Sequence, residues 1–315
     1  MRIVFCGTPA FAVPSLQHLL TQPDFEIVAI LTQPDRPRGR GQEVSASPVK
    51  QAALAAGIPV HQPEKVHAPE VQQLLEGRKP DAIAIIAYGQ IIPARLLPIP
   101  KYGWINLHAS LLPKYRGAAP INWAIANGET KTGVTSMRID AGMDTGEMLL
   151  KREIEIAPGE TAPELTARLG AIGAPLLAET LRSIASGSIQ PQPQDHTDAS
   201  YAPILRKEHA RIDWNRAARE INNHMRGFAP WPGAYTTFRG QLCHLWGEPV
   251  SNIEREKAAG PPGTIAHANA GILVACGDTT ELRLTAVKLE GRKQISASEF
   301  ANGARLTSGE RFGEG

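Results

Sequence analysis

The sequence predicts an α/β protein of two domains, with an N-terminal doubly wound, mostly parallel sheet and a smaller C-terminal β-barrel. Its 315 residues are many for one domain and enough for a hydrophobic core in each of two. In the first half, apolar strand-like runs alternate with helical patterns, which is typical of a parallel sheet with helices on both faces. In the last third, short strand-like runs are separated by Gly, Pro and Asn, which is typical of a small barrel or sandwich.

Apolar, often β-branched runs predict the strands of the N-terminal sheet at residues 2–6, 27–31, 82–87 and 133–139. Apolar residues at helical spacing predict helices at residues 14–20, 49–56, 71–75, 120–126 and 162–185. In a doubly wound sheet the ligand binds beyond the carboxyl ends of the strands. We therefore expect the functional site at residues 88–92 and 106–113, which lie at such ends.

The composition changes after the first domain. Residues 190–205 are rich in Gln, Pro and Asp and have no periodicity, so we interpret them as a linker between domains at 1–189 and 206–315. The second domain is predicted to contain one helix and several short strands, at residues 215–225, 234–238, 242–246, 263–268, 271–275 and 281–287. The Gly-rich, polar tail from residue 302 is expected to be loosely ordered.

Composition and charge exclude several classes of protein. No apolar run approaches the roughly 20 residues that span a bilayer, and the N-terminus lacks the pattern of a signal or transit peptide. We therefore expect a cytoplasmic protein without a membrane role. A net charge of +2 does not by itself indicate nucleic-acid binding. The three cysteines, Cys6, Cys243 and Cys276, are far apart in the sequence, so we expect buried thiols and no metal site.

Asn106 and His108 are the most informative residues of the chain. Side chains two apart in a strand point to the same side, so an amide donor would lie beside a titratable imidazole. In acyl transfer an amide can stabilise an oxyanion and an imidazole can move protons, each being worth roughly 2–4 kcal/mol of barrier. The alternative is a pair of ordinary polar residues near a strand end, and the neighbouring residues favour catalysis.

Asp144 is the preferred carboxylate partner of His108. It lies in a Gly-rich turn, residues 140–147, that follows a predicted strand. A carboxylate near an imidazole favours the protonated ring and fixes its orientation. Asp140 is expected to support the turn, and the segment lacks the bidentate Glu of a calcium-binding loop.

Residues 32–50 are expected to form a basic loop without regular structure, because Pro and Gly recur in it. Its basic residues are Arg36, Arg38, Arg40 and Lys50. Since the loop follows the second strand, it should emerge at the same edge of the sheet as His108. Arginines on a loop suit phosphate groups, so the sequence indicates a polyanionic substrate. The alternative is an ordinary solvated loop.

The turn after the first strand does not predict dinucleotide binding. Gly7 is followed by Pro9 and Phe11, which occupy the places where G-x-G-x-x-G needs its second and third glycines. Gly7 is expected to turn the chain into the first helix, and Phe11 is a candidate for facing the substrate.

Several of these segments together resemble the folate-dependent formyltransferase family. The most specific is residues 106–121, which read Asn-x-His-x-Ser-Leu-Leu-Pro-x-x-Arg-Gly-Ala-Ala-Pro-Ile. Further similarity is carried by residues 3–9, 32–41, 86–90, 140–146, 212–214 and 230–232. The resemblance covers essentially the whole chain, and it implies a Rossmann-like catalytic domain followed by an OB-like barrel.

The resemblance also implies roles for individual residues. The catalytic residues would be Asn106, His108 and Asp144, and no metal is implied. The folate-contacting strip of the family falls on Ser110, Leu111, Leu112 and Pro113, and we add Tyr88 and Gly89 because they lie at the same predicted strand ends. The basic loop resembles the segment that meets the acceptor, with Arg40 matching a known arginine, and we expect Arg36, Arg38 and Phe11 to face the acceptor as well. Around the basic loop the similarity is weaker, because Gln-Glu-Val at 42–44 replaces a more basic run.

The reaction implied is transfer of the formyl group of 10-formyltetrahydrofolate to the α-amino group of methionine on initiator methionyl-tRNA, for initiation of translation. The C-terminal domain would then bind tRNA, and we expect a monomer. One alternative is a formyltransferase for a small amine, such as a ribonucleotide or an amino sugar nucleotide, which would have little use for the basic loop and the C-terminal domain. A non-catalytic tRNA-binding protein and a folate oxidoreductase are the remaining alternatives, and the oxidoreductase ranks last without a dinucleotide motif.

Overall fold

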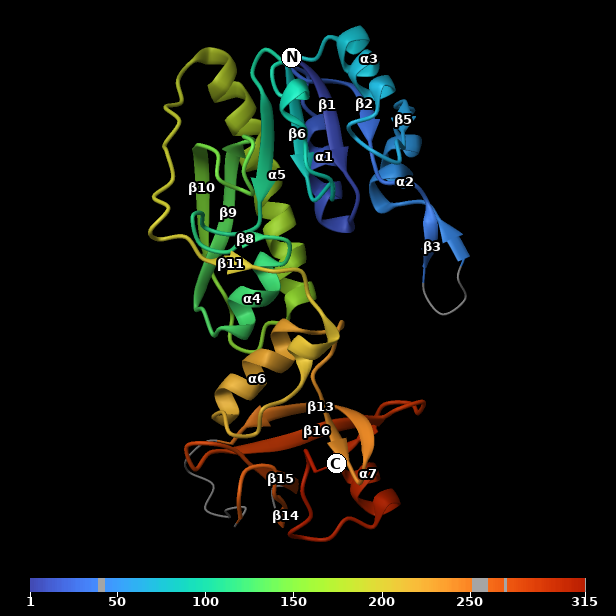
Figure 1. Cartoon of the computed structure of the whole chain (residues 1–315), viewed down its shortest axis with the longest axis vertical. Coiled ribbons are helices and arrows are strands. Elements are labelled where there is room, and N and C mark those ends of the chain that lie inside the picture. The colour runs from blue at the N-terminus through green and yellow to red at the C-terminus, as the bar shows by residue number, and fades with distance from the viewer. Residues whose placement is uncertain (39–42, 251–259, 269–270, 315) are drawn as a thin grey trace. The chain divides into compact units, whose positions relative to one another are not determined.

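The computed structural model of the chain describes residues 1–38, 43–250, 260–268 and 271–314 (Figure 1). These residues divide into two compact units. Unit 1 contains Met1–Pro120, Lys131–Glu155 and Glu164–Ala202, and unit 2 contains Ile121–Thr130, Ile156–Pro163 and Pro203–Gly315. Two short stretches, Ile121–Thr130 and Ile156–Pro163, are thus separated in sequence from the rest of unit 2.

A seven-stranded sheet forms the centre of the described part of unit 1. In spatial order its strands are β10 (Met148–Glu155), β9 (Lys131–Arg138), β7 (Trp104–His108), β6 (Ala82–Ile86), β1 (Arg2–Gly7), β2 (Glu26–Leu31) and β5 (Val60–His61). The strands from β7 to β5 are parallel, and β9 and β10 are antiparallel additions at one edge. The prediction of a doubly wound, mostly parallel sheet is confirmed.

Helices cover both faces of this sheet, because the side chains of a buried strand alternate between two cores. In β1, Val4 and Cys6 face a cluster that includes Val71 and Leu75 of α3 (Pro69–Arg78). The other face carries the long helix α5 (Ala162–Ser186). The hydroxyl of Thr180 on this helix lies 2.7 Å from the hydroxyl of Ser136 on β9. The main helices of the first 186 residues are α1 (Val13–Leu20), α2 (Pro48–Ala55), α3, α4 (Pro120–Ala126) and α5, of which α4 belongs to unit 2 from Ile121 on. Short 3₁₀ turns are η1 (Ala10–Ala12) and η2 (Ala94–Leu96).

The basic loop contains regular structure, which corrects the expectation for residues 32–50. The strands β3 (Arg36–Arg38) and β4 (Glu43–Ser45) pair antiparallel, with Pro37 opposite Val44. A two-stranded ribbon tolerates Pro37 because every strand in it is an edge strand. At its base Lys50 contacts Asp35 and donates to Oε1 of Gln62 at 2.7 Å, so Lys50 is engaged within the protein.

The segment expected to be a linker runs along unit 1 as far as Ala202. Gln192 and Met148 exchange backbone hydrogen bonds of 2.8 Å. Further on, β11 (Tyr201–Ala202) pairs in parallel with β8 (Arg116–Gly117). Sequence composition gives no sign of these contacts, because they join residues far apart in the chain.

Unit 2 is built on a curled antiparallel sheet whose described strands follow the order β12-β13-β16-β15-β14, with β17 beside β16. These are β12 (Tyr235–Phe238), β13 (Gln241–Pro249), β14 (Ile265–Ala268), β15 (Gly271–Ala275), β16 (Glu281–Leu289) and β17 (Ile295–Ser296), and its helices are η3 (Lys207–Ala210), α6 (Ala218–Gly227) and α7 (Ala297–Ala304). The core contains side chains from the sheet, α6 and α7. The prediction of a small β-domain is confirmed.

The C-terminal tail is ordered by its contacts with both edges of this sheet, so the expectation of a loose tail is wrong. The amide of Ile265 on β14 donates to Glu310 O at 2.7 Å, and the amide of Gly313 donates to Thr237 O on β12 at 2.9 Å. Phe312 between them is 1% exposed. The tail therefore joins the two edge strands through backbone hydrogen bonds and a buried ring.

The three cysteines are free and buried, as predicted. Burial raises the pKa of the Cys243 and Cys276 thiols to about 12 and raises that of Cys6 as well. In the part of the chain that the structure describes, no helix combines the length and apolar character that a membrane crossing requires.

Candidate active site

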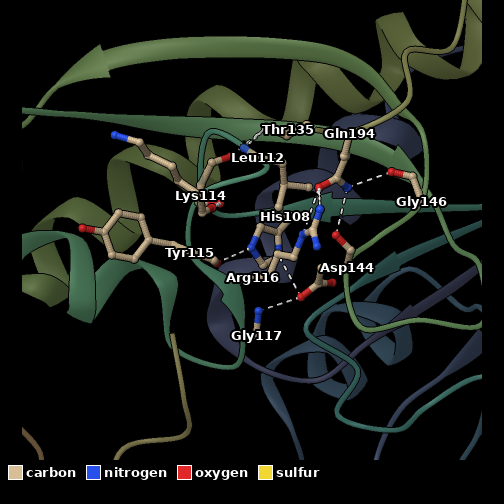
Figure 2. A network of polar contacts seen from close by, with 11 residues as sticks. His108, Leu112, Lys114, Tyr115, Arg116, Gly117, Thr135, Asp144, Gly146 and Gln194 are labelled. Atoms are coloured by element: carbon tan, nitrogen blue, oxygen red, sulfur yellow. Dashed lines mark hydrogen bonds and ion pairs between the residues drawn. The ribbon is translucent and has the colours of Figure 1, made fainter. Parts of the chain in front are cut away.

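Asn106 and His108 lie on β7, between the parallel strand β6 and the antiparallel strand β9. In the β7–β9 register, Asn106 stands opposite Met137 and His108 opposite Thr135. The segments that follow β7 and β9 provide several of the other polar groups near this strand end. Figure 2 shows His108 at the centre of the resulting network.

The hydrogen bonds of His108 define the state of its ring. Nε2 lies 2.9 Å from the backbone oxygen of Tyr115. A carbonyl oxygen only accepts, so Nε2 carries a hydrogen, and Nδ1 is the nitrogen that can gain or lose a proton. Nδ1 faces Oδ2 of Asp144 at 3.6 Å, which is longer than a hydrogen bond. The carboxylate therefore acts on the ring through its charge and leaves room for a proton donor or acceptor at Nδ1.

Asp144 is held in an unusual backbone conformation. Its φ of 53° is left-handed, which for an L-residue costs roughly 1–2 kcal/mol and must be compensated by the surroundings. Oδ2 accepts from the backbone N–H of Gly117 at 2.8 Å. Asp140 accepts from Gly142 and Thr145 within the same turn, which is the supporting role expected for it. The structure thus brings Asp144 to His108 as the sequence predicted.

Two further residues complete the network around Asp144. Nε2 of Gln194 donates to the backbone oxygens of Asp144 and Gly146, both at 2.8 Å. Oε1 of Gln194 accepts from Nε and Nη2 of Arg116 at 3.0 and 2.7 Å. Gln194 and Arg116 are 6% and 2% exposed, so this part of the network is shielded from water. Figure 2 shows the chain of contacts from Arg116 through Gln194 to Asp144.

Asn106 has a side chain that is free to bind a ligand. It is part-exposed, and among the residues that the structure describes none forms a hydrogen bond with its amide. It shares a face of β7 with His108, because the two are separated by one residue. An amide donor placed in this way can meet an oxygen that becomes negatively charged next to the imidazole.

Residues 110–113 form a short strip that is held by hydrogen bonds with Thr135, Lys151 and Lys114. Oγ1 of Thr135 donates to the backbone oxygen of Ser110 at 2.7 Å and accepts from the N–H of Leu112 at 3.1 Å. Nζ of Lys151 donates to the backbone oxygen of Leu112 at 2.5 Å, and partial burial lowers the pKa of this lysine. The Ser110 hydroxyl donates to Lys114 O at 2.6 Å and is therefore engaged. A ligand on this strip would meet mainly backbone groups and apolar side chains.

Tyr88 and Gly89 follow β6 at the same edge of the sheet. The Tyr88 side chain is 2% exposed and packs in the core, and its backbone oxygen accepts from the side chains of Thr8 and Gln33. Gly89 has a φ of +87°, a conformation that glycine adopts readily. Phe11 lies in η1, part-buried, and its backbone oxygen is close to Gly170 of α5.

The structure places the predicted arginines of the loop only in part. Arg36 on β3 is exposed, and its Nη2 lies 3.7 Å from Oε2 of Glu64. Arg38 belongs to the same strand, whereas Arg40 lies outside the described residues. In the ranges that the structure describes, no three His, Cys, Asp or Glu side chains gather as metal ligands.

Sequence reasoning missed four residues that support this site: Arg116, Thr135, Lys151 and Gln194. Arg116 was contained in the segment of highest similarity, so its place in the sequence offered a signal. Thr135, Lys151 and Gln194 had no such signal in the sequence, because their roles depend on contacts between distant segments. Gln194 in addition lies in the segment that we expected to be a linker.

Comparisons with known proteins identify the family of the chain. The formyl transferase domain matches residues 1–181, and the formyl transferase C-terminal domain matches residues 204–305. A methionyl-tRNA formyltransferase of Solibacter usitatus is 54% identical over 316 residues, which cover 100% of this chain and 99% of the relative. The enzyme of the same name from Acidobacterium capsulatum is 51% identical, with 99% of this chain and 100% of the relative covered.

A solved structure extends the similarity to more distant proteins. It is an N-formyltransferase from Helicobacter canadensis in complex with folinic acid and dTDP-3-aminofucose. The TM-score is 0.63 at 18% identity, and the match covers 93% of this chain and 99% of the other, which shows a shared fold. With both domains matched and about half of all residues identical to full-length relatives, the chain belongs to the formyl transferase family, in the group of the methionyl-tRNA formyltransferases.

Proposed function

We propose that the protein transfers the formyl group of 10-formyltetrahydrofolate to the α-amino group of methionine on initiator methionyl-tRNA. One observation carries the chemistry: Nδ1 of His108 faces the Asp144 carboxylate at 3.6 Å on a strand that also presents the free amide of Asn106. Together these groups suit acyl transfer to an amine. The identity of the acceptor is supported by the names of the relatives that match along the whole chain.

The formyl donor supplies an activated one-carbon group attached to N10 of the folate. Residues 110–113, held by Thr135 and Lys151, would support it next to β7. This arrangement fits a flat, partly apolar ligand, because the Ser110 hydroxyl and both backbone polar groups of Leu112 are already bonded within the protein. The folinic acid bound to the Helicobacter canadensis enzyme supports a folate donor in this fold.

His108 and Asn106 would divide the chemical work. As the neutral amine attacks the formyl carbon, the amide of Asn106 donates to the developing oxyanion. His108 uses Nδ1 to take the proton that the amine gives up and to return a proton as the bond to N10 breaks. Asp144 stabilises the imidazolium between these transfers, and Nε2 keeps its bond to Tyr115 throughout. The formyl group is thereby exchanged between two nitrogens without net loss of a proton.

Two surfaces would bind the tRNA. The ribbon of β3 and β4 carries Arg36 and Arg38, and arginine side chains bind phosphates well. On unit 2, the strand register places Tyr235, His244 and Lys288 side by side, and Trp246 follows on the same face of β13. All four are part-exposed. Aromatic rings beside a cation suit the bases and backbone of RNA.

The second candidate is a formyltransferase for an amino sugar nucleotide. The sugar-nucleotide complex from Helicobacter canadensis covers nearly the whole of this chain. The presence of a C-terminal domain therefore does not distinguish the two functions, contrary to what we expected from the sequence. Full-length identity to the methionyl-tRNA enzymes favours the tRNA acceptor.

The direct test is to incubate the purified protein with 10-formyltetrahydrofolate and methionine attached to initiator or elongator tRNA. We expect formyl-methionine on the initiator tRNA, and much less on the elongator. An amino sugar nucleotide and a ribonucleotide amine serve as parallel acceptors. Product with a small amine and none with the initiator tRNA would refute the proposal in favour of the alternative.

We further propose that the protein acts in the cytoplasm, where initiator tRNA is charged and used. We also propose that it is a monomer. Size-exclusion chromatography with light scattering should give a mass near the 33.9 kDa of one chain. A stable mass of twice that value would contradict the monomer.

A further inference from the structure

We propose that Arg116 and Gln194 are positioning residues for formyl transfer, which together hold the Asp144 peptide so that its carboxylate faces His108. The inference rests on the proposed function and deepens it, because it assigns a task in the reaction to two residues that do not touch the reacting atoms. It is carried by the hydrogen bonds, burial and charge of the network in Figure 2.

Arg116 carries a buried positive charge without a carboxylate partner. It is 2% exposed, and none of the acidic side chains that the structure describes lies within ion-pair distance of it. Its donors go instead to Oε1 of Gln194 and to Nδ1 of His196 at 3.1 Å. A buried guanidinium paired only with uncharged acceptors is costly for folding. Such a cost is typical of sites where function has a use for the charge.

Gln194 transmits the effect of that charge to the turn. Two guanidinium N–H groups donate to the same oxygen of its amide, which polarises the amide and makes its Nε2–H groups stronger donors. Both hydrogens are used, on the backbone oxygens of Asp144 and Gly146. The amide thus fixes two peptide oxygens of the turn that carries the catalytic carboxylate.

The same segment of chain holds the carboxylate from the other side. Gly117, which follows Arg116 on β8, donates its N–H to Oδ2 of Asp144 at 2.8 Å. The contacts therefore form a closed ring from Arg116 to Gln194, to the Asp144 peptide, to the Asp144 side chain and back through Gly117. With both its backbone oxygen and its Oδ2 held, Asp144 keeps its left-handed φ of 53° and its distance from His108.

The ring makes a specific prediction for kinetics. If Arg116 and Gln194 act through Asp144, their loss should lower kcat while leaving the KM values for folate and tRNA nearly unchanged. Their loss should also matter little once Asp144 can no longer provide a charge. A residue that merely stabilises the fold would lower the melting temperature and would reduce kcat equally whether or not Asp144 is intact.

The experiment uses the full-length protein with Gln194→Met, Gln194→Glu, Arg116→Met and Arg116→Lys, each alone and with Asp144→Asn. Gln194→Glu keeps an oxygen for Arg116 but loses the two donors to the turn. Gln192→Met is the matched control, because Gln192 is exposed and contacts Met148 through its backbone only. Measurements are kcat, both KM values and the melting temperature.

We expect Gln194→Met, Gln194→Glu and Arg116→Met to lower kcat by 10- to 100-fold, with KM values within threefold of the wild type. Arg116→Lys should recover part of the rate, since an ammonium keeps the charge but cannot bond as a fork. In the Asp144→Asn background, Gln194→Met should lower kcat by less than threefold. Gln192→Met should stay within twofold of the wild type.

Three outcomes would overturn the inference: a wild-type kcat in Gln194→Glu, a loss confined to KM, or the same fold loss with and without Asp144. If Gln194→Met does not fold, the kcat values of Gln194→Glu and Arg116→Lys test the inference instead. The wild-type rate with initiator methionyl-tRNA tests the proposed function separately, because the inference depends only on ratios between variant and wild-type rates.

Discussion

Nε2 of His108 donates to the backbone oxygen of Tyr115 across 2.9 Å, and this bond leaves the other ring nitrogen, Nδ1, facing the Asp144 carboxylate. Tyr115 itself has a left-handed φ of 59°, and its N–H donates to Ser200 Oγ at 2.9 Å. The N–H of Arg116, in the same peptide as the Tyr115 oxygen, donates to Ser200 O at 2.8 Å, so the oxygen that orients the His108 ring is held by the segment after α5. The imidazole cannot use Nε2 for catalysis without giving up this bond.

His108→Ala should lower kcat by roughly 10²- to 10⁴-fold, because the variant lacks the group that moves protons at the reacting nitrogens. Binding of folate and methionyl-tRNA should change little. Steady-state kinetics of formylation and equilibrium binding of each substrate would check this. His67→Ala, at an exposed histidine, is the control. A variant with near-normal turnover would remove His108 from the mechanism.

Lys151→Met should weaken the folate site selectively. The ammonium holds the backbone oxygen of Leu112 at 2.5 Å, and losing such a bond costs about 1 kcal/mol. We expect the KM for 10-formyltetrahydrofolate to rise about fivefold, while the KM for tRNA stays constant. Lys65→Met, at an exposed lysine, should behave like the wild type. A rise in the tRNA KM alone would contradict the assignment of residues 110–113 to folate.

Arg36→Leu and Arg40→Leu should weaken the use of methionyl-tRNA and reduce its dependence on salt. Each lost phosphate contact lowers the slope of log affinity against log salt by roughly one. Filter binding from 50 to 300 mM salt would measure the slope. Arg78→Leu is a suitable control, since α3 ends where β6 begins, at the amino ends of the parallel strands. If the salt slope is unchanged in both variants, the loop at residues 32–50 does not contact the tRNA phosphates.

Acid should destabilise unit 2 through His224. Burial lowers the pKa of this imidazole to about 4 from its ordinary 6.5, so the unfolded chain binds its proton more readily than the folded chain does. The resulting stability is complete above pH 6.5 and is lost as the pH falls towards 4, by about 2 kcal/mol at pH 5. Calorimetry of the wild type and His224→Phe at pH 7 and pH 5 would test this. Equal losses in both proteins would exclude His224 as the cause.

The thiols should be unreactive in the folded protein. Cys6, Cys243 and Cys276 are buried, and their raised pKa values keep them protonated at pH 8. An aromatic disulfide reagent should release no thiolate from native protein and three equivalents from denatured protein. Release of one equivalent from the native protein within minutes would show that one of these sites opens.

The grouping of Asn106, His108 and Asp144 could be predicted because its signal is local. Asn106 and His108 alternate with apolar residues in one strand, and Asp144 stands in a Gly-rich turn after another. The fold class could be predicted for a similar reason, since β1 and β6 are continuous apolar runs. Edge strand β10 was missed because half of it is charged and exposed, which an edge strand permits.

The supporting residues could not be predicted, because their roles arise from contacts across long stretches of sequence. Gln194 belongs to a segment whose composition resembles a spacer, yet it is buried beside Asp144. Helix α7 was not among the predicted elements either, although the start of this helix does have a local signal in the sequence. Ser296 and Glu299 form a capping box, a pattern that is visible in the sequence itself.

The path of the chain after α5 limits how the protein can be altered. This stretch is pinned by Gln192 to Met148 at one end and by β11 to β8 at the other, with Gln194 inserted between. The length of this stretch is therefore set by its contacts with the Asp144 turn and with β8, although its composition resembles that of a spacer. An added residue between Gln192 and Gln194 would move the amide off the Asp144 turn. Grafting, splitting or shortening the chain at this apparent spacer would therefore change the candidate active site.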